Sequence, residues 1–63
     1  MISYEKLRNL MAERGISGRK LAIMAGISKN TTTKFNKNLP VDLSVLIKVS
    51  AALGCKIDDI LDY

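Results

Sequence analysis

Apolar residues recur at helical spacing near the start of the chain. Four of them lie on one side of a helix drawn over residues 4–14: Tyr4, Leu7, Leu10 and Met11. We therefore predict a helix from Tyr4 to Arg14, with Ser3 as its N-cap. Gly15 follows, and it can take the left-handed backbone conformation in which many helices end.

The next part of the chain shows the pattern of two shorter helices, predicted over 18–25 and 29–37. Ser17 and Ser28 are placed as N-caps, since a serine oxygen can accept a hydrogen bond from the free amides of a first helical turn. The side chains expected to face inward are Leu21, Ala22, Ala25, Thr32 and Phe35. Gly26 can adopt the positive φ that a turn of three or four residues requires, so the two helices form a helix-turn-helix.

Two features of this pair depend on packing. Ile23 points nearly opposite to the apolar side of its helix, so Ile23 and Met24 are covered either by another helix of the chain or by a partner. Three consecutive threonines in 29–37 lower the intrinsic helix propensity, because β-branched side chains lose χ1 freedom. The second helix must therefore be held by its contacts with the rest of the domain.

The C-terminal third is predicted to form a helix over 43–53 with two apolar stripes. One stripe holds Leu43, Leu46, Ile47, Ser50 and Leu53, and the other holds Val45, Val49 and Ala52. We interpret this helix as central in the domain and the second stripe as a candidate dimer contact. An extended connector at 39–41 precedes it, with Asp42 as the predicted cap. A short fifth helix is predicted at 59–61, capped by Asp58.

These elements predict an all-α fold, a compact bundle of five short helices in a single domain over residues 1–63. The helix-turn-helix resembles that of the phage-repressor (Cro-type, lambda-repressor-like) family of DNA-binding domains. Five residues fall at the framework positions of that family: Leu21, Ala22, Gly26, Ile27 and Phe35. Two positions depart from its pattern, because Thr32 stands where Ile or Val is usual and Gly18 where a phosphate-touching Gln is frequent.

Positive charge is concentrated in the helix-turn-helix. The chain has a net charge of +4, but residues 14–41 alone carry six Lys and Arg residues and no acid. Residues 1–13 have no net charge, and residues 42–63 have a net charge of −2. A basic block on a defined motif is the electrostatic footprint of a surface that meets phosphates, and the lack of acids argues against a merely solvated face.

The outward side of the helix 29–37 offers groups suited to reading base edges in the major groove. Asn30 can pair with adenine through its amide, and Lys29 and Lys34 can donate to guanine. The methyl group of Thr33 can meet a thymine methyl. In the resembling family the base readers cluster in the first turns of this helix, which implies Ser28, Lys29, Asn30, Thr33 and Lys34. The alternative for each is a polar residue that faces only solvent.

Phosphate contacts are expected on both sides of the groove. Arg19 and Lys20 lie at the start of the helix 18–25, whose free amides and dipole add positive potential. Lys37 and Asn38 end the other helix on the opposite side. The resemblance further implies a homodimer on an inverted repeat of double-stranded DNA, with recognition helices roughly 34 Å apart. The candidate dimer contact in this chain is the stripe of Val45, Val49 and Ala52.

The composition excludes several other kinds of site. With no His and one Cys, the chain can build neither a zinc site nor an internal disulfide, and no cofactor is expected. Cys55 is interpreted as a small buried hydrophobe rather than a reactive thiol. Asp58, Asp59 and Asp62 resemble paired catalytic carboxylates, but no nucleophile–base pair or phosphate loop accompanies them, so no enzyme is expected. No signal peptide or long apolar run is visible, which predicts a soluble cytoplasmic protein.

Two functional hypotheses remain. The first is a sequence-specific DNA-binding protein that represses transcription by covering a promoter. The second is a protein-interaction module of the same fold, such as the antitoxin partner of a toxin, which could also autoregulate its operon. Salt-dependent duplex affinity that is lost in Asn30→Ala with Lys34→Ala favours the first hypothesis. Indifference to those changes, with sensitivity to Val49→Asp, favours the second.

Overall fold

Helices form most of the regular structure in residues 1–62, which are the residues that the structure, a computed structural model, describes. The elements are α1 (Glu5–Arg14), α2 (Gly18–Ala25), α3 (Lys29–Asn36), α4 (Leu43–Leu53) and one turn of 3-10 helix, η1 (Ile57–Asp59). The all-α prediction is confirmed. The helices predicted at 18–25 and 43–53 have the expected bounds, and the one predicted at 29–37 ends one residue earlier.

Both serines predicted as N-caps make the expected contact. The Ser17 Oγ accepts a hydrogen bond from the Lys20 amide at 3.1 Å, and the Ser28 Oγ accepts one from the Thr31 amide at 3.2 Å. Gly26 ends α2 with a φ of 67°, which lets the chain turn sharply into α3. Local chemistry therefore fixes where α2 stops and α3 begins.

The start of α1 differs from the prediction. The helix begins at Glu5, and Tyr4 takes the N-cap position with φ of −107° and ψ of 24°. Ser3 still serves the first turn, because its Oγ accepts from the Glu5 amide at 3.3 Å. Tyr4 is buried with its ring against Phe35, at 4.9 Å between ring centroids, so its conformation is set by tertiary packing rather than by helix formation.

The prediction of a fifth helix at 59–61 is wrong. The 3-10 turn η1 takes its place, so the described residues hold four α-helices and one 3-10 turn. The Asp59 carboxylate accepts from the Lys56 amide at 3.0 Å. Lys56 is therefore the N-cap, and Asp58 lies inside the turn instead of capping a later helix.

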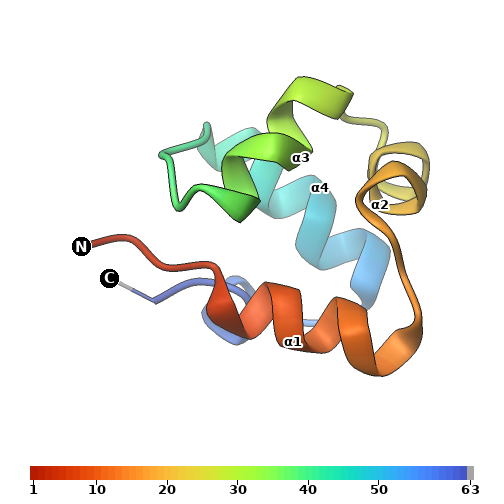
Figure 1. Cartoon of the computed structure of the whole chain (residues 1–63), viewed down its shortest axis with the longest axis horizontal. Helices are drawn as coiled ribbons and strands as arrows, with labels where there is room; N and C mark the ends of the chain where they lie inside the picture. The colour runs from red at the N-terminus through yellow and green to blue at the C-terminus, as the bar shows by residue number, and fades with distance from the viewer. Residues whose placement is uncertain (63) are drawn as a thin grey trace.

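The core lies between α4, which crosses behind α2 and α3, and α1, which closes the other side (Figure 1). Its buried apolar residues come from all four α-helices, from the residue before α1 and from the residue after η1: Tyr4, Leu7, Leu21, Phe35, Leu46, Val49, Leu53 and Ile60. Thr32, one of the two residues that depart from the family pattern, is buried as well. Its hydroxyl donates to the Lys29 carbonyl at 2.6 Å, which supplies the partner that a buried hydroxyl requires.

The two stripes of α4 are divided differently from the prediction. Val49 has no exposed surface, whereas Leu43 and Ile47 are 63% and 52% exposed. A side chain without accessible surface cannot meet a second subunit, so the assignment of Val49 to a dimer contact is wrong. Val45 and Ala52 are only partly buried. The buried side of α4 follows the spacing of Leu46, Val49, Ser50 and Leu53, because α2 packs on that side.

The two ends of the described chain lie side by side (Figure 1). Ser3 and Asp62 form an antiparallel bridge with N–O distances of 2.8 and 3.0 Å. The Lys6 ammonium adds an ion pair with Asp62 at 3.3 Å and donates to the Asp58 carbonyl at 3.1 Å. The acidic C-terminal segment is thereby held against α1.

Candidate nucleic-acid interface

α3 separates a buried side from an exposed polar side. Thr32 and Phe35 point into the core, at 7% and 2% exposure. The opposite side presents exposed amide, ammonium and hydroxyl side chains: Lys29, Asn30, Thr33 and Lys34. The structure thus places four of the five predicted base-reading residues on one accessible side of one helix.

The fifth predicted base reader, Ser28, is occupied at the start of α3. Besides capping Thr31, its Oγ lies 2.8 Å from the Thr31 hydroxyl oxygen. The Thr33 hydroxyl also has a partner within the helix, since it donates to the Lys29 carbonyl at 3.3 Å. Ser28 therefore acts first as a cap. The sequence pattern did not single out Thr31, although a residue three positions after a serine cap is a natural partner for that serine.

The residues predicted to contact phosphate lie at two exposed sites. Arg19 and Lys20 are exposed in the first turn of α2. Lys37 and Asn38 are exposed at the end of α3, and Asn38 has a left-handed backbone, with φ of 55°. The Asn38 Oδ1 accepts hydrogen bonds from the Tyr4 amide at 3.0 Å and from the Arg8 guanidinium at 2.9 Å. Its amide nitrogen is the atom suited to donate to a phosphate oxygen.

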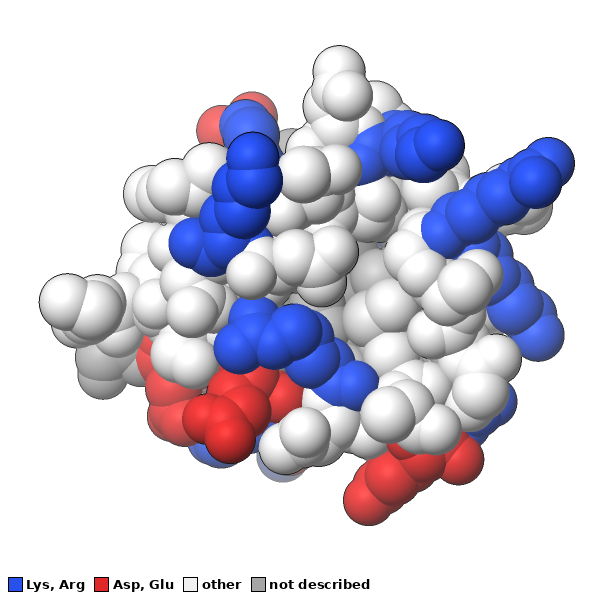
Figure 2. Space-filling view, in the orientation of Figure 1, with Lys and Arg blue, Asp and Glu red and all other residues white. Residues whose placement is uncertain are grey.

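The charges of the helix-turn-helix are not neutralised by neighbouring acids. Within residues 1–62 the one ion pair is Lys6–Asp62, so the six cations of 14–41 have no carboxylate within 4.0 Å. Figure 2 shows Lys and Arg side chains spread over the half of the face formed by α2 and α3. The acids visible there lie mainly along the edge formed by α1 and the chain ends. An unpaired basic surface of this kind attracts polyanions.

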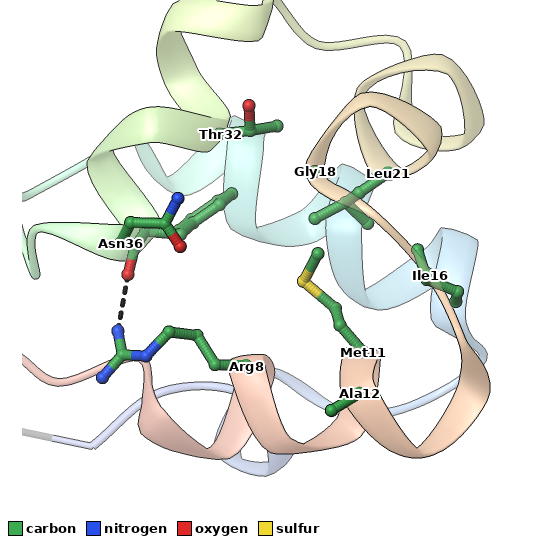
Figure 3. Close-up of a pocket in the computed structure, with 9 residues that line it drawn as sticks. Arg8, Met11, Ala12, Ile16, Gly18, Leu21, Thr32 and Asn36 are labelled. Atoms are coloured by element: carbon green, nitrogen blue, oxygen red, sulfur yellow. Dashed lines mark hydrogen bonds between the residues drawn. The ribbon is translucent and has the colours of Figure 1, made fainter.

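A hollow of about 270 Å³ lies between α1 and the helix-turn-helix (Figure 3). Met11 and Ile16 form part of its apolar wall, and Gly18 lies at its edge. A Cβ atom at Gly18 would have Thr32 as its nearest neighbour, at 3.8 Å from Oγ1, which is an ordinary contact. The position at which the family often carries Gln is therefore sterically open in this chain.

Arg8 is a residue of this region that the sequence analysis missed. Its Nη1 donates to the Phe35 carbonyl at 2.6 Å as well as to Asn38. Arg8 and Phe35 are 27 positions apart, so no local pattern could have connected them. Its positive charge also did not stand out, because residues 1–13 have no net charge.

Other chemistries have little support in the described residues. No three His, Cys, Asp or Glu side chains of residues 1–62 are grouped so that they could hold a metal ion. No helix of that part of the chain has the length and apolar character needed to span a membrane. Cys55 is half-buried against the core, and burial, with the Asp59 carboxylate, raises the pKa of its thiol against the opposing effect of Arg14. A raised pKa reduces the thiolate fraction and hence the reactivity.

The chain is similar to one known family of DNA-binding domains and to one solved transcriptional regulator. The sequence profile of the Cro/C1-type HTH DNA-binding domain matches residues 6–63. The crystal structure of the transcriptional regulator VanUg, Form II, is similar with a TM-score of 0.88 and 36% sequence identity, over 97% of this chain and 81% of that one. No curated protein matches the sequence. The profile covers nearly the whole chain, and the chain therefore belongs to the Cro/C1-type helix-turn-helix DNA-binding family.

Proposed function

We propose that this protein is a sequence-specific transcriptional regulator, a repressor of phage or bacterial type, that places α3 in the major groove of double-stranded DNA. The observation that carries the proposal is the division of α3 into a core-facing side and an exposed polar side. Because Thr32 and Phe35 fix the rotation of the helix, Asn30 and Lys34 point away from the domain. Amide and ammonium groups held in this way match the donor and acceptor patterns of base edges.

Each of the predicted base-reading residues has a role that follows from its chemistry. Asn30 pairs with adenine, and Lys29 and Lys34 donate to guanine. Thr33, whose hydroxyl bonds within the helix, offers its methyl group to thymine. Ser28 caps α3 and so holds the first turn of the helix, which carries Lys29 and Asn30 to the DNA.

Phosphate binding then orients the domain without adding sequence information. Arg19 and Lys20 hold one strand near the start of α2, and Lys37 and Asn38 hold the other near the end of α3. Three of these residues are cations, so two bound domains neutralise about six phosphates, and the logarithm of the affinity falls with the logarithm of the salt concentration at a slope of roughly −5.

Two copies of the domain on an inverted repeat would reach the affinity that a regulator needs, with α3 helices roughly 34 Å apart. The exposed apolar side chains of α4 suited to this self-contact are Leu43 and Ile47, next to the partly buried Val45 and Ala52. A repressor of this kind acts by covering a promoter against other proteins.

The test is in vitro selection of bound duplexes from a random pool, followed by binding measurements on the selected sequence. A palindromic consensus is expected. The double variant Asn30→Ala with Lys34→Ala should lose about 100-fold in affinity for that duplex, from two base contacts. The matched control is Asn9→Ala with Lys48→Ala, which removes the same two residue types from exposed positions of α1 and α4. Selection without enrichment, or equal losses in both double variants, would contradict the proposal.

One observation favours a protein partner as a second candidate function. Ile23 and Met24 on α2 are 75% and 42% exposed, so no helix of the described chain covers them. An antitoxin that binds its toxin through α2 and regulates its own operon through α3 would use both surfaces. Ile23→Asp should then abolish toxin binding and leave duplex affinity unchanged. Val49→Asp does not serve here, because Val49 is in the core and its substitution would unfold the domain.

A further inference from the structure

The C-terminal end of α3 is held by residues from the first helix of the chain and its N-cap. The Arg8 guanidinium, from α1, donates through Nη1 to the Phe35 carbonyl at 2.6 Å and to the Asn38 Oδ1 at 2.9 Å. Figure 3 shows the Arg8 side chain extended from α1 to the end of α3. The last carbonyls of a helix have no partner within it, so a cation that reaches one of them both satisfies it and complements the helix dipole.

Tyr4 completes this contact from the start of α1. Its amide donates to the Asn38 Oδ1 at 3.0 Å, and its hydroxyl donates to the Leu39 carbonyl at 2.7 Å. Its ring meets Phe35 edge to face at an interplanar angle of 74°. We call the set formed by Tyr4, Arg8, Phe35, Asn38 and Leu39 the α1–α3 contact.

The α1–α3 contact matters for the position of α3 because a hollow lies beside it, between α1 and the helix-turn-helix. The hollow of about 270 Å³ separates α1 from the helix-turn-helix, with Met11 on one wall and Thr32 on the other. Part of the boundary between α1 and α3 is therefore not filled by side chains, so fewer contacts fix the angle between the two helices there. With three threonines in its eight residues, α3 also depends on its contacts to keep its direction.

We propose that Arg8 and Asn38 are positioning residues for base recognition: they hold α3 at the angle at which Asn30 and Lys34 meet base edges, without themselves touching a base. The inference rests on the proposed function. Base reading requires atoms placed to a fraction of an ångström, whereas phosphate attraction tolerates a small rotation of the helix. Loosening the α1–α3 contact should therefore reduce discrimination between sequences more than it reduces affinity for DNA in general.

Arg14 provides a matched control for Arg8. Its Nη1 donates to the Leu53 carbonyl at 2.6 Å, which is the same kind of bond to the end of a different helix, α4. Arg8→Gln and Arg14→Gln each remove one positive charge and one bond to a carbonyl at a helix end, and Arg8→Gln also removes the bond to the Asn38 Oδ1. The helix whose end Arg8 holds carries the base-reading residues, whereas the helix whose end Arg14 holds does not.

The experiment measures the affinity of wild type, Arg8→Gln and Arg14→Gln for the selected duplex and for a random-sequence duplex over a range of salt concentrations. For Arg8→Gln the ratio of specific to non-specific affinity should fall about tenfold, the value of one charged hydrogen bond, with the salt slope unchanged. Arg14→Gln should leave the ratio within about twofold of wild type. Thermal melting checks that both variants are folded at the temperature of the assay.

A second variant separates the side chain of Asn38 from its backbone. Asn38→Gly keeps the left-handed conformation at φ of 55° without strain and removes the acceptor that Tyr4 and Arg8 share. It should lower the specificity ratio as Arg8→Gln does. Arg8→Lys, which can still reach one acceptor, should restore part of the ratio.

Two results would overturn the inference. One is an equal ratio in Arg8→Gln and Arg14→Gln. The other is a uniform loss of affinity in Arg8→Gln with a salt slope smaller by about one, which would make Arg8 a phosphate contact. The proposed function itself would fail differently, because wild type would then show no preference for any duplex.

Discussion

The two ends of α3 are held in different ways. The start is fixed by its own segment, since Ser28 caps the helix and bonds to Thr31 three residues later. The end is fixed by distant residues, since Arg8 and Tyr4 bond to the carbonyls and the asparagine that close the helix. Short-range chemistry thus determines where the helix begins, and tertiary contacts determine its direction. Substitutions at the two ends of α3 should therefore change the free energy of unfolding and the binding of DNA by different amounts.

The largest effect is expected from removing the aromatic anchor at the end of α3. Phe35→Ala deletes a ring that is 2% exposed and packs on Tyr4, and it should cost about 3–5 kcal/mol of unfolding free energy. That is a large part of the stability of a domain this small. Urea denaturation followed by circular dichroism measures it, with Phe35→Leu as a control that should lose less. A midpoint unchanged in Phe35→Ala would show that the end of α3 is held by other means.

The Tyr4 hydroxyl should give the next effect. Tyr4→Phe removes the bond to the Leu39 carbonyl and should cost about 1 kcal/mol at neutral pH. Burial raises the pKa of Tyr4 above its ordinary 10.0, with an opposing backbone hydrogen bond at Val41. The fold favours the neutral phenol of Tyr4. Its contribution to the free energy of unfolding is therefore complete below pH 10.0, and it falls at higher pH as the phenol ionises in the unfolded chain.

The free energy of unfolding measured between about pH 8 and 11 should accordingly decline more steeply in wild type than in Tyr4→Phe. Both proteins should carry Cys55→Ser, because burial raises the pKa of that thiol too and produces a decline of the same sign. Parallel pH profiles would contradict the assignment to Tyr4.

At the start of α3, Ser28→Ala removes the cap and should cost about 1 kcal/mol, or a fall in Tm of about 4–8 °C. Ser17→Ala removes the equivalent cap of α2 and should have a similar thermal effect. The two variants should differ in binding, because only Ser28 supports the turn that carries Lys29 and Asn30. Ser28→Asp, which keeps a capping oxygen, tests whether the cap alone accounts for the loss of stability.

The smallest effect is a gain at a position away from both ends of α3. Gly18→Gln restores the residue frequent in the resembling family at a site where a Cβ has only ordinary contacts. Affinity for DNA should rise a few-fold through one added phosphate hydrogen bond, about 1 kcal/mol. The salt slope should not change, because a neutral amide releases no counterion. Gly18→Ala, which stabilises the helix without adding the amide, is the control.

Local signals in the sequence were sufficient to place most of the helices. Ser17, Ser28 and Gly26 act through hydrogen bonds and dihedral angles within a few residues, and each behaves as predicted. The inward positions of Thr32 and Phe35 followed from helical spacing for the same reason. The exposed side of α3 could thus be read from the sequence, although its contact with DNA remains a prediction.

Features that depend on tertiary packing could not be read in this way. α4 is apolar on two sides, and its packing against α2 and the rest of the core decides that Val49 is buried while Ile47 is exposed. Asp58 was predicted to cap a helix at 59–61, but it lies inside a 3-10 turn whose Asp59 carboxylate accepts from the Lys56 amide. Arg8 had no local signal, because its acceptors lie 27 and 30 positions away.

The dependence of α3 on its neighbours limits how its binding surface can be transplanted. A synthetic peptide of residues 28–38 would be mostly coil in water, because its 8-residue helix is shorter than the ~12–15 residues at which isolated helices become even marginal and it carries three threonines. Conversely, the core is not supported by the exposed α3 side chains Lys29, Asn30, Thr33 and Lys34. They can be exchanged as a group within the intact domain, which makes the domain a suitable host for libraries of new operator preferences.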